Sequence, residues 1–451
     1  MTSNEKLNEL GLFDARVPRY TSYPTAPHFK TEVTDSHVTD WLSMIKSGKQ
    51  ISVYVHVPFC RRLCWFCACR TQGTSSAAPV EAYVATLKAE LRLLARSLPE
   101  GVEIEHLHWG GGTPTLLSPA MMKDLAEAIF AVAPLAKDAQ FSVEIDPNEV
   151  DDARMDMLAQ IGMNRASIGV QDFDSTIQQT IGREQSYDVT RSTVEGLRAR
   201  GIKSLNMDIL YGLPHQTNAK ISDSVQLLLS LSPDRVALYG YAHVPWMARR
   251  QGLIPTDALP TPEERLDLFE TARKLFDWDG YAEIGIDHFA CPTDGLAKAQ
   301  KAGTLRRNFQ GYTEDTSDTL IGIGASAISR FPQGYAQNNP ATSGYQKAVR
   351  NGAFATHKGH ALTRDDIWRG RMIEMLMCDF EVDFADLANE TGAPIKDIRA
   401  VADDVQAAFG DMVIISPKGL EIPTSAQPLT RMIARKMDAY SVSSSGHSHA
   451  I

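Results

Sequence analysis

The sequence predicts an α/β fold in which parallel strands alternate with helices and curve toward a partial barrel, followed by a smaller, mostly α-helical domain. Three observations lead to this fold class. Strand-like segments recur six times between residues 51 and 242. Helical segments with clear ends separate them, and from about residue 360 helical sequence dominates. Repeated β/α units form parallel sheets with helices outside, and six units can curl such a sheet.

The first strand shows the two-residue alternation most clearly. In 51–57, Ile51, Val53, Val55 and Val57 share one face, while the polar residues between them share the other. This period of two indicates a strand with two different faces. Further strands are expected near 103–109, 140–146, 164–171, 203–210 and 235–242.

Residues typical of helix starts and helix ends lie in the intervals between these strands. Ser118 followed by Pro119 is typical of an N-cap and a first helical residue. Segments 152–161 and 188–200 each end at a glycine, a common C-terminal stop. Thr261–Glu264 has the composition of a capping box. We therefore expect a helix after most strands and every strand's C-terminal end at one mouth.

The last hundred residues have a different pattern. Thr363 is a candidate N-cap for a helix through Met375, Val413–Pro423 is expected to form a hairpin, and 428–438 to form a final helix. A Ser/Gly/His tail follows, for which we predict disorder. Helices with a hairpin can form a winged helix, but the many acidic residues here favour a packing domain over a DNA reader.

Composition excludes several classes of protein. The formal net charge is −10, which argues against a general nucleic-acid-binding surface. We find no apolar stretch long enough to span a bilayer and no signal-peptide pattern, so we expect a cytoplasmic protein. Six cysteines in 451 residues are too few for a disulfide scaffold, and their placement is therefore informative.

Four cysteines, Cys60, Cys64, Cys67 and Cys69, fall within ten residues just after the first strand. Thiolates bind soft metals, and structural zinc sites usually draw them from two separated pairs. No second pair follows downstream. The spacing of the first three favours three corners of a [4Fe–4S] cluster over zinc or structural thiols. Three thiolates leave one iron open to bind another molecule.

The pattern Tyr-x-His-x-Pro-Phe-Cys-x3-Cys-x2-Cys at 54–67 resembles that of the radical S-adenosylmethionine (SAM) enzymes. Longer motifs narrow the resemblance to the oxygen-independent coproporphyrinogen III oxidase family. They are Pro18–Thr25 (PRYTSYPT), the Cys67-x-Cys69 extension, His108–Thr115 (HWGGGTPT) and Arg307–Tyr312 (RNFQGY). The resemblance runs from about residue 16 to about residue 435. Haem chaperones of the same superfamily are the alternative, but they lack the first motif and the fourth cysteine.

The resemblance implies an activity. Such an enzyme converts two propionates of coproporphyrinogen III to vinyl groups, giving protoporphyrinogen IX in haem biosynthesis, through a 5′-deoxyadenosyl radical. It implies a [4Fe–4S] cluster, two SAM molecules per chain, an electron donor such as flavodoxin or ferredoxin, and a monomer. The sequence itself identifies neither the donor nor the order in which the rings react.

The resemblance also implies residue roles. Cys60, Cys64 and Cys67 would hold the cluster. Catalytic roles fall to Tyr54, His56, Cys69, Phe309 and Gln310. Cofactor contacts fall to Tyr54, Phe66, Gly111, Gly112, Thr113, Glu144, Gln171, Arg183, Asp208, Ala242 and Ile328. Our candidates for the substrate propionates are Arg19, Arg306 and Arg307, because guanidinium groups pair with carboxylates. For single residues other roles stay open: His56 as a packed strand residue, the glycines as a tight turn, and Arg183 as a surface ion-pair partner.

These observations divide the chain into an N-terminal arm or lid (1–35), a radical SAM catalytic domain (36–355), a C-terminal helical accessory domain (356–438) and a disordered tail (439–451). The arm precedes the first strand and is free to fold across the mouth of the barrel. Its rings, Tyr20 and Tyr23, would then pack on a tetrapyrrole face, with Arg19 facing a propionate.

Overall fold

A computed structural model describes residues 3–440 and 449–451 of the chain. Its centre is one sheet of 12 strands in the order β16-β15-β14-β13-β1-β4-β5-β6-β7-β8-β10-β9. Six neighbouring strands are parallel and carry the predicted segments: β1 (Gln50–Val57), β4 (Glu103–Gly111), β5 (Leu135–Ile145), β6 (Arg165–Gln171), β7 (Ser204–Tyr211) and β8 (Arg235–Gly240). All six predicted strands are confirmed.

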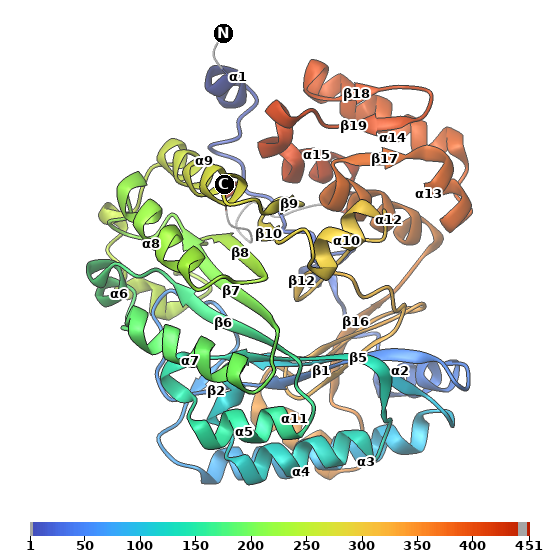
Figure 1. Ribbon diagram of the computed structural model, residues 1–451. Helices are drawn as coiled ribbons and strands as arrows, with labels where there is room; N and C mark the ends of the chain where they lie inside the picture. Colours follow the sequence, from blue (N-terminus) through green and yellow to red (C-terminus); the bar gives the residue numbers. More distant parts are fainter. Residues whose placement is uncertain (1–2, 441–448) are drawn as a thin grey trace.

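Shorter strands extend the sheet on both sides. β13 (Leu320–Ile323) joins β1 in parallel, and three antiparallel strands continue from it. The described sheet ends at β16 and β9, so the barrel is partial, as predicted (Figure 1). The added strands are β14 (Ile328–Phe331), β15 (Gly334–Asn338), β16 (Thr356–Ala361), β10 (His288–Ala290) and β9 (Ala282–Ile284).

Helices cover the outer face of the parallel strands (Figure 1). Most of their apolar sides pack with the buried side of the sheet, where Val55 and Trp109 are 0% exposed, in one continuous core, whereas the buried residues of α6 and α10 belong to two smaller clusters. The Ser118 hydroxyl caps its helix, and Thr261 and Glu264 form the expected capping box. The helices are α3 (Ala78–Ser97), α4 (Pro119–Phe130), α5 (Asp152–Gln160), α6 (Ser175–Thr180), α7 (Tyr187–Ala199), α8 (Asn218–Ser230), α9 (Pro262–Trp278), α10 (Gly295–Lys301) and α11 (Thr342–Arg350).

The C-terminal region is mostly helical, as predicted, and has a small sheet in the order β17-β19-β18. The Thr363 side chain caps the first helix, and the predicted hairpin is the pair β18–β19. The elements are α12 (Arg364–Asp379), β17 (Glu381–Asp383), α13 (Phe384–Thr391), α14 (Ile395–Phe409), β18 (Ile414–Ile415), β19 (Gly419–Glu421) and α15 (Thr430–Met437).

The N-terminal arm packs on this C-terminal region. α1 (Ser3–Glu9) lies beside it in Figure 1, and α2 (Asp35–Ser43) begins the catalytic part. Tyr20 and Tyr23, each 5% exposed, belong to the C-terminal apolar core. The Tyr20 hydroxyl donates to Asp438 Oδ2 at 3.0 Å, and Ala439 N donates to the Tyr23 hydroxyl at 3.0 Å. Both rings are thus held by protein, unlike our expectation that they pack on a substrate.

The last three residues also differ from the prediction of a disordered tail. Ala450 and Ile451 are buried, and residue 449 forms a bridge with Arg16 of the arm. Arg431 of α15 donates to the carbonyls of Val17 and Pro18, at 2.5 and 3.1 Å, and to those of residues 449 and 450. These contacts order the three residues. Residues 441–448, also predicted as disordered, lie outside the described part of the chain.

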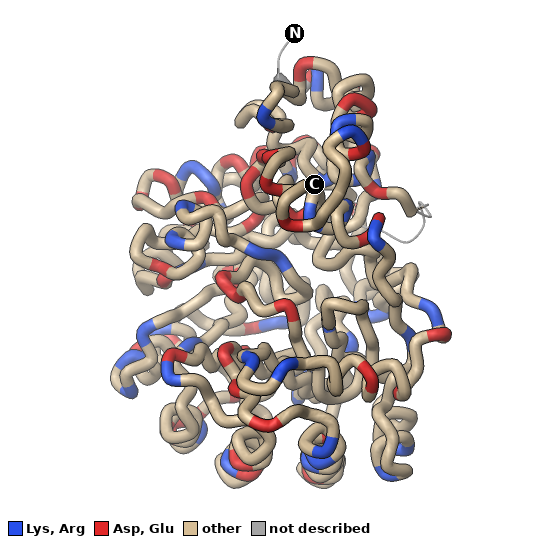
Figure 2. The backbone as a smooth tube through the Cα atoms, turned by 90° about the vertical axis from the view of Figure 1, so that its right-hand side faces the viewer, with Lys and Arg blue, Asp and Glu red and all other residues tan. Residues whose placement is uncertain are grey.

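Charges on the surface are mixed. Blue and red segments are interspersed over the outer helices in the view of Figure 2. No helix of the described residues is long and apolar enough to cross a membrane.

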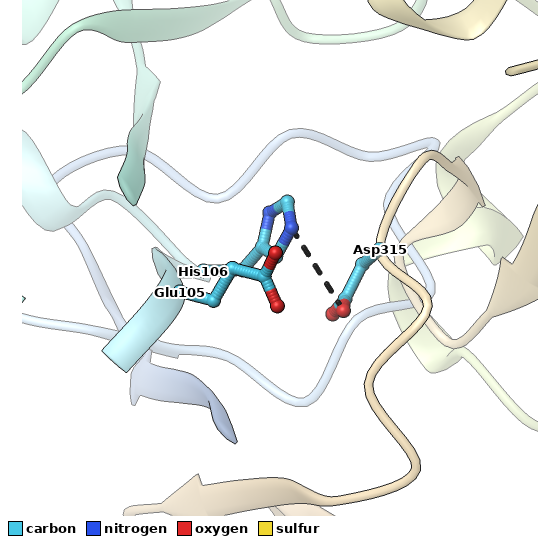
Figure 3. Close-up of side chains that lie close together, drawn as sticks. All are labelled: Glu105, His106 and Asp315. Atoms are coloured by element: carbon cyan, nitrogen blue, oxygen red, sulfur yellow. Dashed lines mark ion pairs between the residues drawn. The ribbon is translucent and has the colours of Figure 1, made fainter. Parts of the chain in front are cut away.

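Glu105, His106 and Asp315 meet near the N-terminal ends of the strands, away from the cysteine loop (Figure 3). A register shift between β1 and β4 places Glu105 in a bulge, which brings its side chain toward that of His106. Asp315 also accepts from the hydroxyl of Ser52 and the backbone N–H of Ser317. The carboxylate therefore has hydrogen-bond partners from the protein.

Candidate metal and cofactor site

The cysteine loop leaves the C-terminal end of β1 and is held at both of its sides. β2 (Phe59–Cys60) pairs with β3 (Gln72–Gly73). Thr113 N donates to Phe59 O at 2.8 Å, and Trp65 N donates to Ile181 O at 2.9 Å. The loop is therefore fixed between the segment after β4 and the turn after α6. These two attachments orient its thiols.

The spacing of the sulfurs suits a cluster better than a single ion. Among the described residues, the only group of three or more His, Cys, Asp and Glu side chains with all ligand atoms within 4.8 Å is the one in Figure 3. Cys60, Cys64 and Cys67 therefore stand farther apart than this. Sulfurs around one zinc ion would be about 3.8 Å apart, given Zn–S bonds of about 2.3 Å. At least one pair of the three sulfurs is therefore too far apart for a preformed site around a single zinc ion.

Cys67 and Cys69 differ in protonation. The Cys69 thiol and Cys69 N–H both donate to Cys67 Sγ, the latter at 3.4 Å, and they lower the pKa of Cys67. The same hydrogen bond and the charge on Cys67 raise the pKa of Cys69 well above its usual value. Cys67 is thus prepared as a thiolate ligand, whereas Cys69 stays a neutral thiol beside it.

Tyr54 and His56 of β1 link this strand to the cysteine loop. The Tyr54 hydroxyl lies 2.9 Å from His56 Nδ1, and His56 Nε2 lies 3.3 Å from Arg70 O. Burial lowers the pKa of His56. A neutral ring that donates from Nε2 to Arg70 O and accepts from Tyr54 satisfies both contacts. His56 thus braces the cysteine loop.

Glu144, at the end of β5, points toward the glycine turn. Its Oε2 accepts from Gly111 N at 3.0 Å, and His108 Nε2 lies 3.4 Å from its Oε1. Burial opposes ionisation, but these hydrogen bonds lower the pKa of Glu144, which is therefore a carboxylate. Gly111 has φ +111°, and a Cβ there would lie 2.4 Å from the His56 ring. A tight turn against protein atoms thus already requires glycine at this position.

Arg183 lies between the cysteine loop and the strand ends, and it is 8% exposed. Its Nη1 donates to Asp146 Oδ2 at 3.2 Å and lies 3.6 Å from Cys64 Sγ; its Nη2 donates to Gly169 O at 2.9 Å. Its Nε is buried without a partner among the described residues. The surface ion pair that we left open is therefore excluded, and one N–H of Arg183 keeps unused hydrogen-bonding capacity.

Asp208 lies on the same inward face, on β7. Asn206 Nδ2 donates to its Oδ1 at 2.8 Å. Burial, together with the charge of Glu144, raises its pKa to about 7. Gln171, at the end of β6, has φ +72°, next to a register shift with β7. Such backbone strain in a non-glycine residue is most common at functional sites.

A second group joins the cysteine loop to the segment after β8. Gln251 Nε2 donates to Phe66 O at 2.7 Å and to Ala242 O at 3.0 Å. Gln251 is 1% exposed. We did not predict Gln251 from the sequence, because it lies in a long irregular connection without a motif.

Other predicted residues lie apart from the loop. Phe309 and Gln310 form the turn between β11 (Arg306–Asn308) and β12 (Gly311–Thr313), where Phe309 contacts the Tyr335 ring edge-on. Ile328 begins β14 on the far side of β13. Arg306 Nη1 lies 3.8 Å from Glu374. By contrast, Arg19 and Arg307 face one large cavity together.

Comparisons with known proteins agree with this geometry. The radical SAM superfamily model matches residues 54–228. The oxygen-independent coproporphyrinogen III oxidase of Paracoccus denitrificans is 61% identical over 451 residues, 100% of both chains. The protein of that name from Cereibacter sphaeroides is 56% identical over 98% of each chain. The chain belongs to the oxygen-independent coproporphyrinogen III oxidase family.

A solved structure extends this likeness to the fold. Coproporphyrinogen III oxidase from Escherichia coli, a radical SAM enzyme, matches with a TM-score of 0.90 at 34% identity, covering 95% of this chain and 100% of that one. Radical SAM membership implies a [4Fe–4S] cluster and SAM. The predicted family is thereby confirmed, and the haem-chaperone alternative has no support among these relatives.

Proposed function

We propose that this protein oxidatively decarboxylates two propionates of coproporphyrinogen III to vinyl groups and so produces protoporphyrinogen IX. The identity of 61% with a curated oxidase along the entire chain carries the proposal. The three thiols at the mouth of the barrel support it independently, because their chemistry and spacing fit a [4Fe–4S] cluster.

We assign Cys60, Cys64 and Cys67 as the cluster ligands. Bound there, the cluster and SAM supply the radical that removes a hydrogen atom from a propionate. The protein's residues bind, orient and exclude water. In this proposal the free Arg183 N–H holds the SAM carboxylate, Asp208 accepts from ribose hydroxyls, and the backbone of 111–113 approaches the ligand closely.

Two SAM molecules per chain are consistent with two groups of candidate residues. Glu144, Arg183 and Asp208 share the inward strand ends, whereas Phe66 and Ala242 meet through Gln251. Phe309, Gln310 and Ile328 come from other segments, and we place them in the second group on the family pattern alone. We further propose that the protein acts as a monomer in the cytoplasm and receives electrons from a flavodoxin or ferredoxin.

Anaerobic turnover tests the function. The reconstituted protein, given reductant, SAM, coproporphyrinogen III and a one-electron acceptor for the electron that each decarboxylation releases, should release carbon dioxide and form protoporphyrinogen IX. Stoichiometric haem binding without any decarboxylation would replace the proposal with a haem chaperone.

Replacing Cys69 with serine should keep the cluster but remove most of the turnover. The neutral Cys69 thiol lies beside Cys67 rather than completing a ligand set, and a fourth thiolate would block the open iron. Iron content and protoporphyrinogen IX formation measure the two effects. Loss of iron comparable to that in Cys60→Ser would show that Cys69 is a ligand.

SAM affinity should increase with pH through about 7 and level off above it. Asp208 has its pKa raised to about 7, so at lower pH the neutral acid must lose its proton before it accepts from both ribose hydroxyls. Anaerobic equilibrium dialysis with labelled SAM between pH 6 and 8.5 measures the change. Asp208→Asn should remove this increase; if the variant keeps the same increase, another group is responsible.

A further inference from the structure

A cavity of about 530 Å³ lies between the ends of β7 and β8, α9, the arm and the C-terminal helix α15. Five arginines and three acidic side chains line it, together with Ile451, the last residue of the sequence. Two of the carboxylates, Glu270 and Glu283, pair with Arg273 at 2.7 and 3.8 Å. The remaining four arginines, Arg19, Arg265, Arg307 and Arg431, share Asp287 as their acidic neighbour on the cavity wall.

These four arginines lack ordinary ion-pair partners. Arg307 Nη2 lies 3.6 Å from Asp287 Oδ2, and no acidic side chain of the described residues lies within 4.0 Å of the other three guanidinium groups, although Arg265 Nε lies 3.2 Å from the main-chain oxygen of Ile451. Burial and the nearby charge of Arg19 lower the pKa of Arg431 to about 9. Arg307 is buried, Arg265 and Arg431 are half-buried and Arg19 is exposed. Buried cations are normally paired, so the inner part of the cavity favours an anion.

Three of the four arginines have N–H groups to spare. Arg307 is 7% exposed, and its Nε and Nη1 are buried without a partner in the described chain. Arg265 gives one hydrogen bond from each nitrogen, to the main-chain oxygens of Gly212, Tyr241 and Ile451, which leaves two of its five N–H groups. Arg19 donates once, to Gly240 O. Arg431 instead donates four hydrogen bonds to main-chain oxygens of the arm and of residues 449–450, so its role is to hold these segments.

The cavity adjoins the proposed cofactor site. Tyr239 of β8 forms part of its wall and is half-buried, and its pKa is raised by burial and by the charges of Asp208 and Asp287. The next residues lead to Ala242, which Gln251 ties to the cysteine loop. A ligand in this cavity is therefore one strand away from Asp208.

We propose that this cavity binds the carboxylate-bearing edge of the tetrapyrrole, with Arg265 and Arg307 each holding one propionate while another is at the reaction centre. The inference rests on the proposed function and adds Arg265, which the sequence did not single out. The arginines outnumber the acidic side chains on the wall, which suits a ligand with several carboxylates. Aromatic side chains on the wall, among them Tyr211, Tyr239 and Phe269, suit pyrrole rings.

Fluorescence titration with coproporphyrin III tests the site on the full-length, cluster-containing protein. Arg265→Gln and Arg307→Gln should each weaken binding about 10- to 100-fold, since a charge-assisted hydrogen bond is lost. Arg265→Lys should lose less. The comparison is Arg273→Gln, which lines the same cavity but is paired with glutamates; because it also removes one positive charge from the wall, its affinity should decrease, but by clearly less than in the other two variants. The uncharged tetramethyl ester should bind all variants alike.

Kinetics separate this proposal from the proposed function. In both glutamine variants KM for coproporphyrinogen III should increase, while iron content and SAM affinity stay normal. If both variants bind coproporphyrin III as tightly as Arg273→Gln, the cavity is not the propionate site, whatever the turnover. If the wild-type protein binds the porphyrin through these arginines but never decarboxylates coproporphyrinogen III, the cavity assignment stands and the proposed function fails.

Discussion

Replacing Cys64 with serine is expected to remove the cluster and with it all turnover. The wild-type protein, reconstituted without oxygen, should contain about four iron and four sulfide per chain. Cys64 is buried beside Arg183, so a serine there leaves one iron without its thiolate. Turnover should fall to the assay background, because enzymes commonly provide accelerations on the order of 10⁶-fold or more. Iron, sulfide and protoporphyrinogen IX are the measurements.

Cys60→Ser and Cys67→Ser should behave in the same way, and Cys291→Ser is the matched control. Cys291 is half-buried, and its thiol donates to the carbonyl of Pro233, away from the loop. Full iron content in the Cys64 variant, or stoichiometric zinc without sulfide in the wild-type protein, would contradict the cluster assignment.

Replacing Arg183 with glutamine is expected to lower SAM-dependent turnover by roughly 100-fold or more. The substitution leaves Asp146 without its cationic partner and removes the N–H that we assign to the SAM carboxylate. Truncating one member of a buried charge pair costs about 2–5 kcal/mol, and 2.8 kcal/mol corresponds to about 100-fold. Anaerobic SAM binding and steady-state turnover measure the loss.

A surface arginine provides the comparison. Arg200 of the same β/α unit pairs with the exposed Asp152 and Asp156, and Arg200→Gln should leave both measurements near wild type. An Arg183 variant with normal SAM affinity but reduced thermal stability would show that Arg183 only supports the fold.

The regular part of the fold was predictable because it depends on local periodicity. All six parallel strands alternate clearly or end at polar residues, and capping residues such as Ser118 and Thr363 act through neighbours three positions away. The pairing of the arm with the C-terminal region was not predictable. Tyr20 and Tyr23 meet partners more than 400 residues later in the chain, and no local pattern encodes such a contact.

In the candidate site, too, local sequence predicts some residues and not others. Cys60, Cys64 and Cys67 stand in one short motif, and polar residues such as Glu144 and Asp208 stand where parallel strands end together. Arg306 and Arg307, adjacent in sequence, have different surroundings, since only Arg307 lines the large cavity. Arg265 was missed because it is one of several charged residues on an amphipathic helix, and its helix packing decides which way it faces.

The bonds from Arg431 to Val17 and Pro18 have a consequence for the order of folding. The arm is made first, but its apolar residues, Leu12 and Phe13 among them, have their packing partners in the C-terminal core. During synthesis these residues stay exposed until α15 has left the ribosome, while the β/α units can already assemble. The wall of the arginine cavity is therefore completed last, and a nascent chain acquires its cysteine loop well before it can enclose a substrate.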